Sequence, residues 1–199
     1  MEDRATCLDI LSPYAQKHAL RIWAYCLMDN YIHLLAVPED ENSLARAVGL
    51  TNQVYAQYLN RKLSQLRCIW QNRFYSCIVE SDPDLWAVAC YNENNPVKAG
   101  LVESAEDYPW SSAKAHLAGA ADASLDESLW MDENERSAYA EFVMNSDISM
   151  DKTTSRAAST GRPLGTEAFM SEMESMFHRI LRPRKPGRPR KMKEYGECP

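Results

Sequence analysis

The sequence lacks three features that mark common classes of protein. It has no run of about 18 consecutive apolar residues, so no segment is suited to cross a membrane as a helix. Its first residues, Met1–Cys7, contain no basic region followed by an apolar core, which argues against a secretory signal. Its six cysteines form no Cys-x-x-Cys pair, which argues against a zinc finger. We therefore expect a cytoplasmic protein whose cysteines are reduced and are either buried small hydrophobic residues or idle thiols.

The chain has the composition of an ordinary globular protein, but its charge is unevenly distributed. It has 199 residues, of which 45% are apolar, so it is long enough for one large or two small domains. The net charge is −6 overall, yet the first 181 residues sum to −11, because seven basic residues and no acid lie within Arg182–Lys193. This split indicates a body with a local site and a tail that attracts an anionic partner. A solvated, disordered terminus is the alternative.

Hydrophobic periodicity in the first part of the chain predicts helices and strands together, which is an α+β fold. We expect a helix at Asp3–His18 and then a β-hairpin with strands Leu20–Leu27 and Tyr31–Val37. A long helix at Ser43–Leu63 and a strand at Phe74–Val79 are expected to follow.

Proline and small residues divide the rest of the chain. Asp82 and Pro83 predict the start of a helix that Pro96 stops at about Asn95, and a short helix is expected to end at His116. Two further helices are expected at Asp132–Met144 and Thr166–Leu181, with a flexible connection at 145–165 between them. We divide the chain into a domain at 1–117, a linker with a short helical segment at 118–165, and a C-terminal helix with a basic tail at 166–199.

Three residues in the first domain could carry chemistry. Tyr31, His33 and Leu35 share one face of a strand, and His33 could bind a metal ion or be a hydrogen-bonded core or edge residue. Tyr91 and Asn95 are four residues apart, so they share one face of a helix. A divalent cation beside Tyr91 would favour the nucleophilic phenolate, and an amide oxygen suits such a cation. The alternative is a half-buried aromatic residue followed by a helix cap.

Basic and aromatic residues alternate after the long helix. Lysine and arginine suit phosphates, and flat rings suit unpaired bases, so this pattern predicts a contact with single-stranded nucleic acid. A solvated surface with a buried tryptophan would have the same composition. The residues expected to contact nucleic acid here are Arg61, Lys62, Arg67, Trp70 and Arg73.

The basic tail is interrupted by three prolines, which forbid a helix and predict an extended segment. An extended Gly-Arg-Pro strip between cations is thin enough to enter the minor groove of A·T-rich DNA. The tail residues expected to bind DNA are Arg184, Lys185, Arg188, Arg190 and Lys191.

Several of these segments, in this order, resemble the REP-associated tyrosine transposases, a branch of the single-tyrosine HUH transposases. The resemblance covers about 20–117 and 160–191. It is carried by the blocks AYCLMDNYIHLL (24–35), YLNR (58–61), IWQNRF (69–74), YNENNPVKAGLV (91–102) and EDYPWSS (106–112).

The resemblance implies a ferredoxin-like α+β fold that cuts single-stranded or hairpin DNA through a 5′-phosphotyrosine link. Tyr91 matches the nucleophile, while His33 and Asn95 match two ligands of a divalent cation, Mg²⁺ or Mn²⁺. Tyr31 stands where the family has the first histidine of a His-hydrophobic-His motif. A neutral phenol is a poor ligand for a hard cation, so we expect metal binding to be weaker by orders of magnitude.

The sequence also begins near the first helix, where the family has an earlier strand. We therefore expect an N-terminally shortened sheet whose edge is exposed or covered in a homodimer. The leading expectation is a transposase-type DNA nuclease and strand transferase in the cytoplasm, associated with the nucleoid. The alternatives are a protein that binds DNA hairpin repeats without cleaving them and a gene product without a role.

Overall fold

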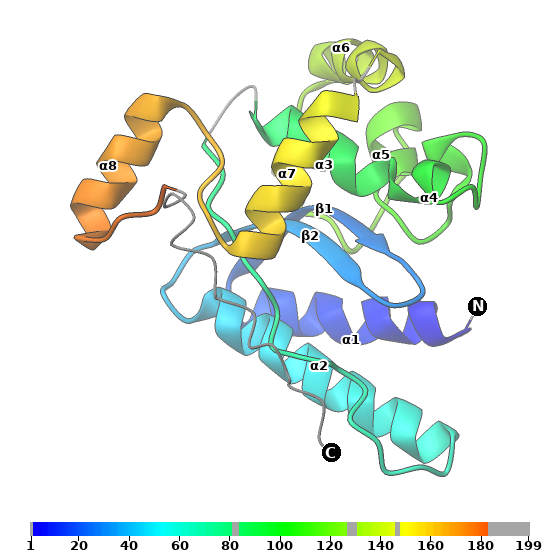
Figure 1. Cartoon of the computed structure of the whole chain (residues 1–199). Coiled ribbons are helices and arrows are strands. Elements are labelled where there is room, and N and C mark those ends of the chain that lie inside the picture. The colour runs from blue at the N-terminus through cyan, green and yellow to red at the C-terminus, as the bar shows by residue number, and fades with distance from the viewer. Residues whose placement is uncertain (1, 81–83, 127–130, 146–147, 183–199) are drawn as a thin grey trace, which may run out of the picture.

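The protein is α+β, as the sequence predicts, with helices on both faces of an antiparallel hairpin (Figure 1). The computed structural model describes residues 2–80, 84–126, 131–145 and 148–182. Its elements are α1 (Glu2–Lys17), β1 (Leu20–Leu27), β2 (Ile32–Pro38), α2 (Ser43–Lys62), α3 (Asp84–Glu93), α4 (Asn95–Lys98), the 3-10 helix η1 (Ala105–Asp107), α5 (Ala113–Ala118), α6 (Glu133–Met144), α7 (Ile148–Thr160) and α8 (Glu167–Phe177).

Helices α1 and α2 lie against one face of the hairpin, and α3 and α7 lie over the other (Figure 1). Strand β1 pairs antiparallel with β2, and a bulge at Trp23 shifts the register between Ile22 and Ala24. Because of this shift, Ile22 packs toward α1 and α2 while Ala24 packs toward α3. On its other edge, β1 is hydrogen-bonded to the segment around Trp110.

The alternation of β2 sets which side chains face α3. Ile32 and Leu34 pack in the core shared with α1 and α2, whereas Leu35 is buried with Val88 and Ala89 of α3. Residues two apart on a strand share a face, so His33 is on the α3 side with Leu35. The sequence prediction that His33 and Leu35 share one face of the strand, opposite Ile32 and Leu34, is confirmed.

The expected strand at Phe74–Val79 is wrong. Within the described residues the sheet has two strands, and Val79 makes an isolated parallel bridge to Leu164. The Leu164 amide donates to the Ile78 carbonyl, and the Glu80 amide donates to the Leu164 carbonyl, both at 2.8 Å. The segment therefore pairs with a distant part of the chain instead of extending the hairpin, and such a long-range contact leaves no local signal in the sequence.

Two other expectations about helices need correction. The segment at 145–165 is not a flexible connection, because α7 occupies most of it and buries Ala157 in the core beneath α3. Pro96 does not end helical structure: α3 ends at Glu93, and Pro96 lies in the first turn of α4. Proline is tolerated there because its missing N–H would have no partner inside the helix. The expected start at Asp82 and Pro83 lies outside the described residues.

A buried carboxylate fixes α3 against the helices that follow it. Glu93 Oε1 accepts a hydrogen bond from Ser112 Oγ at 2.5 Å and lies 2.5 Å from His116 Nδ1, while Oε2 accepts one from Tyr139 at 2.8 Å. The four side chains are at most 3% exposed. Since a buried polar group is tolerated only when it is hydrogen-bonded, this network sets the rotation of α3 about its axis.

The cysteines and the helices agree in part with the sequence analysis. Cys7, Cys26 and Cys90 are buried as expected, and burial raises the pKa of Cys7 and Cys26 to about 12, but Cys68 is exposed. None of the described helices is long and apolar enough to span a membrane.

Candidate functional site

Tyr91 lies beside His33, as the family resemblance implies. The two rings meet edge to face with their centroids 5.3 Å apart. Tyr91 is half-buried, whereas its helix neighbours Ala89 and Cys90 are buried. The Tyr91 ring therefore lies against His33 of the hairpin and stays partly exposed.

Asn95 connects the helices to the hairpin. Its Nδ2 donates to the Tyr91 carbonyl at 2.7 Å, and its Oδ1 accepts a hydrogen bond from the Tyr31 hydroxyl at 3.2 Å. A carbonyl can only accept, so the amide nitrogen must face Tyr91 and the amide oxygen must face Tyr31. The structure thus brings together all three residues assigned from the sequence, with Tyr31 as a fourth.

Lys98 is a member of this cluster that the sequence analysis did not identify. Its Nζ lies 5.2 Å from the centroid of the Tyr91 ring. Lys98 lies three residues after Asn95 on α4, so one short helix carries both side chains to this cluster. The block at 91–102 contains Lys98, but the spacing across Pro96 gave no reason to place it beside Tyr91.

His33 and Tyr31 of the cluster are neutral near pH 7. Burial, followed by the positive charge of Lys98, lowers the pKa of His33 to about 4. Burial, followed by the neighbouring Tyr91, raises the pKa of Tyr31. The cluster therefore places two neutral side chains, His33 and Tyr31, and the Lys98 ammonium group close to the Tyr91 ring.

The divalent cation implied by the family resemblance does not fit these residues. His33 and Asn95 offer one neutral nitrogen and one neutral oxygen, and the Tyr31 hydroxyl already hydrogen-bonds to that oxygen. In the part of the chain that the structure describes, no three histidine, cysteine or acidic side chains are grouped as metal ligands would be. Hard cations such as Mg²⁺ prefer carboxylates and octahedral oxygen sets. The donor set is too poor for a resident cation.

The second predicted site follows α2 and lies on the opposite side of the hairpin from α3 (Figure 1). Arg61, Arg67 and Arg73 are exposed there, as a contact with nucleic acid requires. Asn60 holds this segment in place, because its side chain accepts from the Arg67 amide at 3.0 Å and donates to the Arg67 carbonyl at 2.9 Å.

Two residues of that set have structural partners. Lys62 Nζ donates to Asp3 Oδ1 at 2.6 Å, and this contact raises the pKa of Lys62. The Trp70 indole donates to the Asn52 carbonyl at 2.8 Å, and its ring lies 6.0 Å from that of Tyr55. Trp70 therefore anchors the segment to α2 and is half-buried, which corresponds to the alternative considered for it in the sequence.

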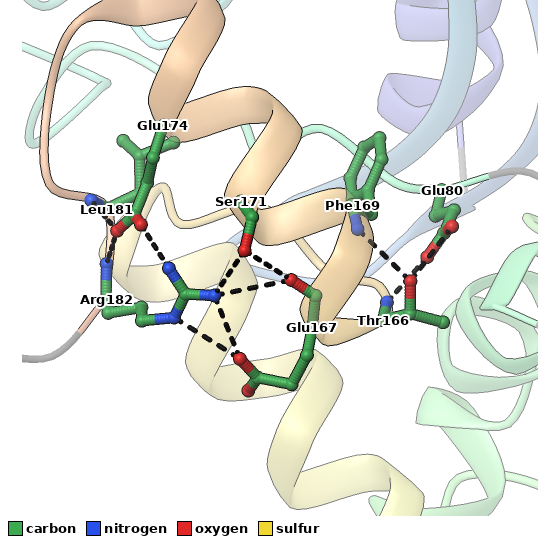
Figure 2. Close-up of polar contacts among 8 residues, drawn as sticks. All are labelled: Glu80, Thr166, Glu167, Phe169, Ser171, Glu174, Leu181 and Arg182. Atoms are coloured by element: carbon green, nitrogen blue, oxygen red, sulfur yellow. Dashed lines mark hydrogen bonds and ion pairs between the residues drawn. The ribbon is translucent and has the colours of Figure 1, made fainter.

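The tail predicted to bind DNA, including Arg184, Lys185, Arg188, Arg190 and Lys191, lies outside the described residues. Figure 2 shows how the chain reaches it, with Arg182 folded back onto α8. Its Nη2 donates to Glu167 Oε2 and to Ser171 Oγ, both at 2.9 Å, and its Nη1 donates to Glu174. Arg182, which follows α8, thus pairs with two glutamates of that helix, Glu167 and Glu174.

Hydrogen bonds to Glu80 hold the N-terminal end of α8 in place. Thr166 caps α8 as predicted, since its hydroxyl accepts from the Phe169 amide at 3.2 Å. The same hydroxyl donates to Glu80 Oε1 at 3.1 Å, and the Thr166 amide donates to Glu80 Oε2 at 2.5 Å (Figure 2). The expected helix is shorter than predicted, because it ends at Phe177 and His178 adopts a positive φ.

Comparison with known proteins agrees with the motifs. Residues 1–95 match the family model described as transposase IS200 like. A Haemophilus influenzae protein, named as a candidate REP-associated tyrosine transposase, is 32% identical over 99 residues. The aligned part covers 45% of this chain and 56% of that relative, so the chain spans little more than half of the relative's length. No solved structure matched the chain. The resemblance is confirmed for the N-terminal half.

Proposed function

We propose, on the premise that residues 1–95 are an IS200-like transposase domain, that this protein binds single-stranded or hairpin DNA and cleaves and rejoins it through Tyr91. The observation that carries the proposal is the position of Tyr91. Its ring is half-buried, with the His33 ring and the Lys98 Nζ close to it. A nucleophile needs this combination of support and access.

The proposed reaction exchanges one phosphodiester for another. The Tyr91 oxygen forms a bond to phosphorus, and the bond from phosphorus to the 3′ oxygen breaks. The strand on the 3′ side of the break stays attached to Tyr91 through its 5′ phosphate, and the strand on the other side leaves with a 3′ hydroxyl. The phenol loses one proton and the departing 3′ oxygen gains one, so no co-reactant is consumed. Attack by a new 3′ hydroxyl reverses these steps and joins the strand to another end. The residues of this chain supply positioning and charge, and no step is assigned to a divalent cation, since His33 and Asn95 do not fit one.

The other parts of the chain extend the contact with DNA in this proposal. Arg61, Arg67 and Arg73 contact phosphates along α2, and the basic tail adds attraction that decreases with salt. The homodimer and the association with the nucleoid remain predictions.

Binding without cleavage is the second candidate function, and Tyr31 favours it. Its hydroxyl hydrogen-bonds to Asn95 at the position where the family resemblance implies a histidine ligand. A site with Tyr31 in place of that histidine could hold a DNA phosphate without activating it.

One experiment separates the two functions. Labelled hairpin DNA with single-stranded flanks is incubated with the full chain, and covalent adducts are resolved on a denaturing gel. The proposal predicts an adduct in the wild type that Tyr91→Phe abolishes and that the matched control Tyr14→Phe, on α1, leaves intact. Tight binding without any adduct would establish the binder instead.

A further inference from the structure

Lys98 brings a positive charge to the cluster around Tyr91. Its Nζ lies 5.2 Å from the Tyr91 ring centroid, and it is the charged group that acts on His33. A DNA phosphate that reaches Tyr91 must therefore come close to this ammonium group. The family resemblance assigns the same task, neutralising the phosphate, to a cation that the ligands here do not fit.

We propose that Lys98 binds the phosphate presented to Tyr91 and takes the place of a divalent cation beside it. The inference rests on the proposed function, since it assumes that DNA enters at Tyr91. A lysine is a compact charge on a flexible stem with three donors, so it can follow a phosphate oxygen without fixed geometry. Charge placed where negative charge accumulates stabilises phosphoryl transfer, whether a metal or a side chain provides it.

Asn95 and Tyr31 then have a positioning role. Asn95 Nδ2 holds the Tyr91 carbonyl and Oδ1 holds the Tyr31 hydroxyl, so the amide fixes the end of α3 relative to β2. Lys98 is on the same short helix as Asn95. The amide sets where the ammonium group stands, and it does not itself contact the phosphate.

A cleavage-independent measurement tests this inference. The ring proton between the two nitrogens of His33 is followed by NMR in the full chain, with its signal assigned by its loss in His33→Gln. A single strand of six thymidines is added in the presence of EDTA. We expect the His33 signal to shift and saturate in the wild type and in Lys98→Arg. Lys98→Gln should weaken binding about fivefold to tenfold, while the exposed control Lys114→Gln should stay within about twofold.

Metal is tested with the same signal. MnCl₂ alone should leave His33 sharp up to about 0.1 mM, whereas Tyr31→His, which restores a ligand, should broaden at lower concentrations. Broadening of the wild-type signal at micromolar Mn²⁺ would overturn the inference. So would the absence of any shift with the thymidine strand, or equal binding in Lys98→Gln.

These outcomes are distinct from those for the proposed function. A shift that depends on Lys98, without any covalent adduct, would support phosphate binding by Lys98 and refute cleavage. An adduct that requires Mn²⁺ and is unchanged in Lys98→Gln would support cleavage and refute the role of Lys98.

Discussion

Tyr91 and Glu93 are two residues apart on α3, yet they lie in opposite environments. Two residues correspond to about 200° around a helix, so Tyr91 lies against His33 near the turn of the hairpin and Glu93 faces the core. Around Glu93, hydrogen-bond donors from three side chains surround one carboxylate, and none of the four is more than 3% exposed. Around Tyr91, the His33 ring packs edge to face and the Lys98 Nζ lies 5.2 Å from the Tyr91 ring centroid. The inner face of α3, which carries Glu93, is closed by hydrogen bonds, whereas the outer face, which carries Tyr91, stays partly exposed.

The largest expected effect is on the inner face. Glu93→Ala leaves buried donors without an acceptor, so it should lower the free energy of unfolding by about 3–5 kcal/mol. Tyr91→Phe should change it by less than about 0.5 kcal/mol. Urea unfolding monitored by circular dichroism checks both values. A loss after Tyr91→Phe as large as that after Glu93→Ala would mean that the two faces do not differ in role.

The next effect is a pH dependence on the outer face. The unfolded chain protonates His33 near pH 6.5, but the folded chain does so only at about pH 4. The unfolded state therefore binds more protons between these values, and stability that is complete above pH 6.5 decreases as the pH falls toward 4. The wild type should lose about 2–3 kcal/mol over this range relative to His33→Gln. Parallel pH profiles of the two proteins would contradict the burial of a neutral imidazole.

A smaller effect separates two neighbouring cations at the end of α2. Arg61→Gln should reduce the slope of log binding constant against log salt by about 1, because an exposed arginine releases a counterion on binding DNA. Lys62→Gln should reduce it less, because Lys62 pairs with Asp3. Fluorescence anisotropy at several salt concentrations measures both slopes. Equal slopes would show that the contact with Asp3 breaks when DNA binds.

A small effect on stability is also expected for Tyr31→Phe. It removes the exposed hydrogen bond to Asn95, which should cost at most about 1 kcal/mol of stability. The same urea measurement applies, and a cost as large as that of Glu93→Ala would place Tyr31 among the structural residues.

Local patterns predicted the parts of this molecule that depend on neighbouring residues. The hairpin, α2 and the Thr166 cap follow from alternation, helical spacing and capping chemistry, and the placement of His33 on the α3 side follows from the strand period. The approach of Tyr91 and Asn95 to the hairpin came from the family motifs, because nothing local brings segments 60 residues apart together.

The sequence could not predict contacts that depend on the complete fold. Two such contacts join residues far apart in the sequence. They are the pairing of Val79 with Leu164 and the burial of Ala157 in the core with α3. The charged residues were also hard to assign. Glu93 is buried and Lys62 is neutralised by α1, while Lys98 reaches Tyr91 only because Pro96 starts a new helix instead of ending the old one.

The most direct test of the central claim is the site of covalent attachment. The full chain is incubated with hairpin DNA, digested with nuclease and trypsin, and the modified peptide is sequenced by mass spectrometry. We predict a nucleotide phosphate on Tyr91, within the tryptic peptide that ends at Lys98. A phosphate on another tyrosine of that peptide, such as Tyr75, or DNA that binds and is never attached, would contradict the account.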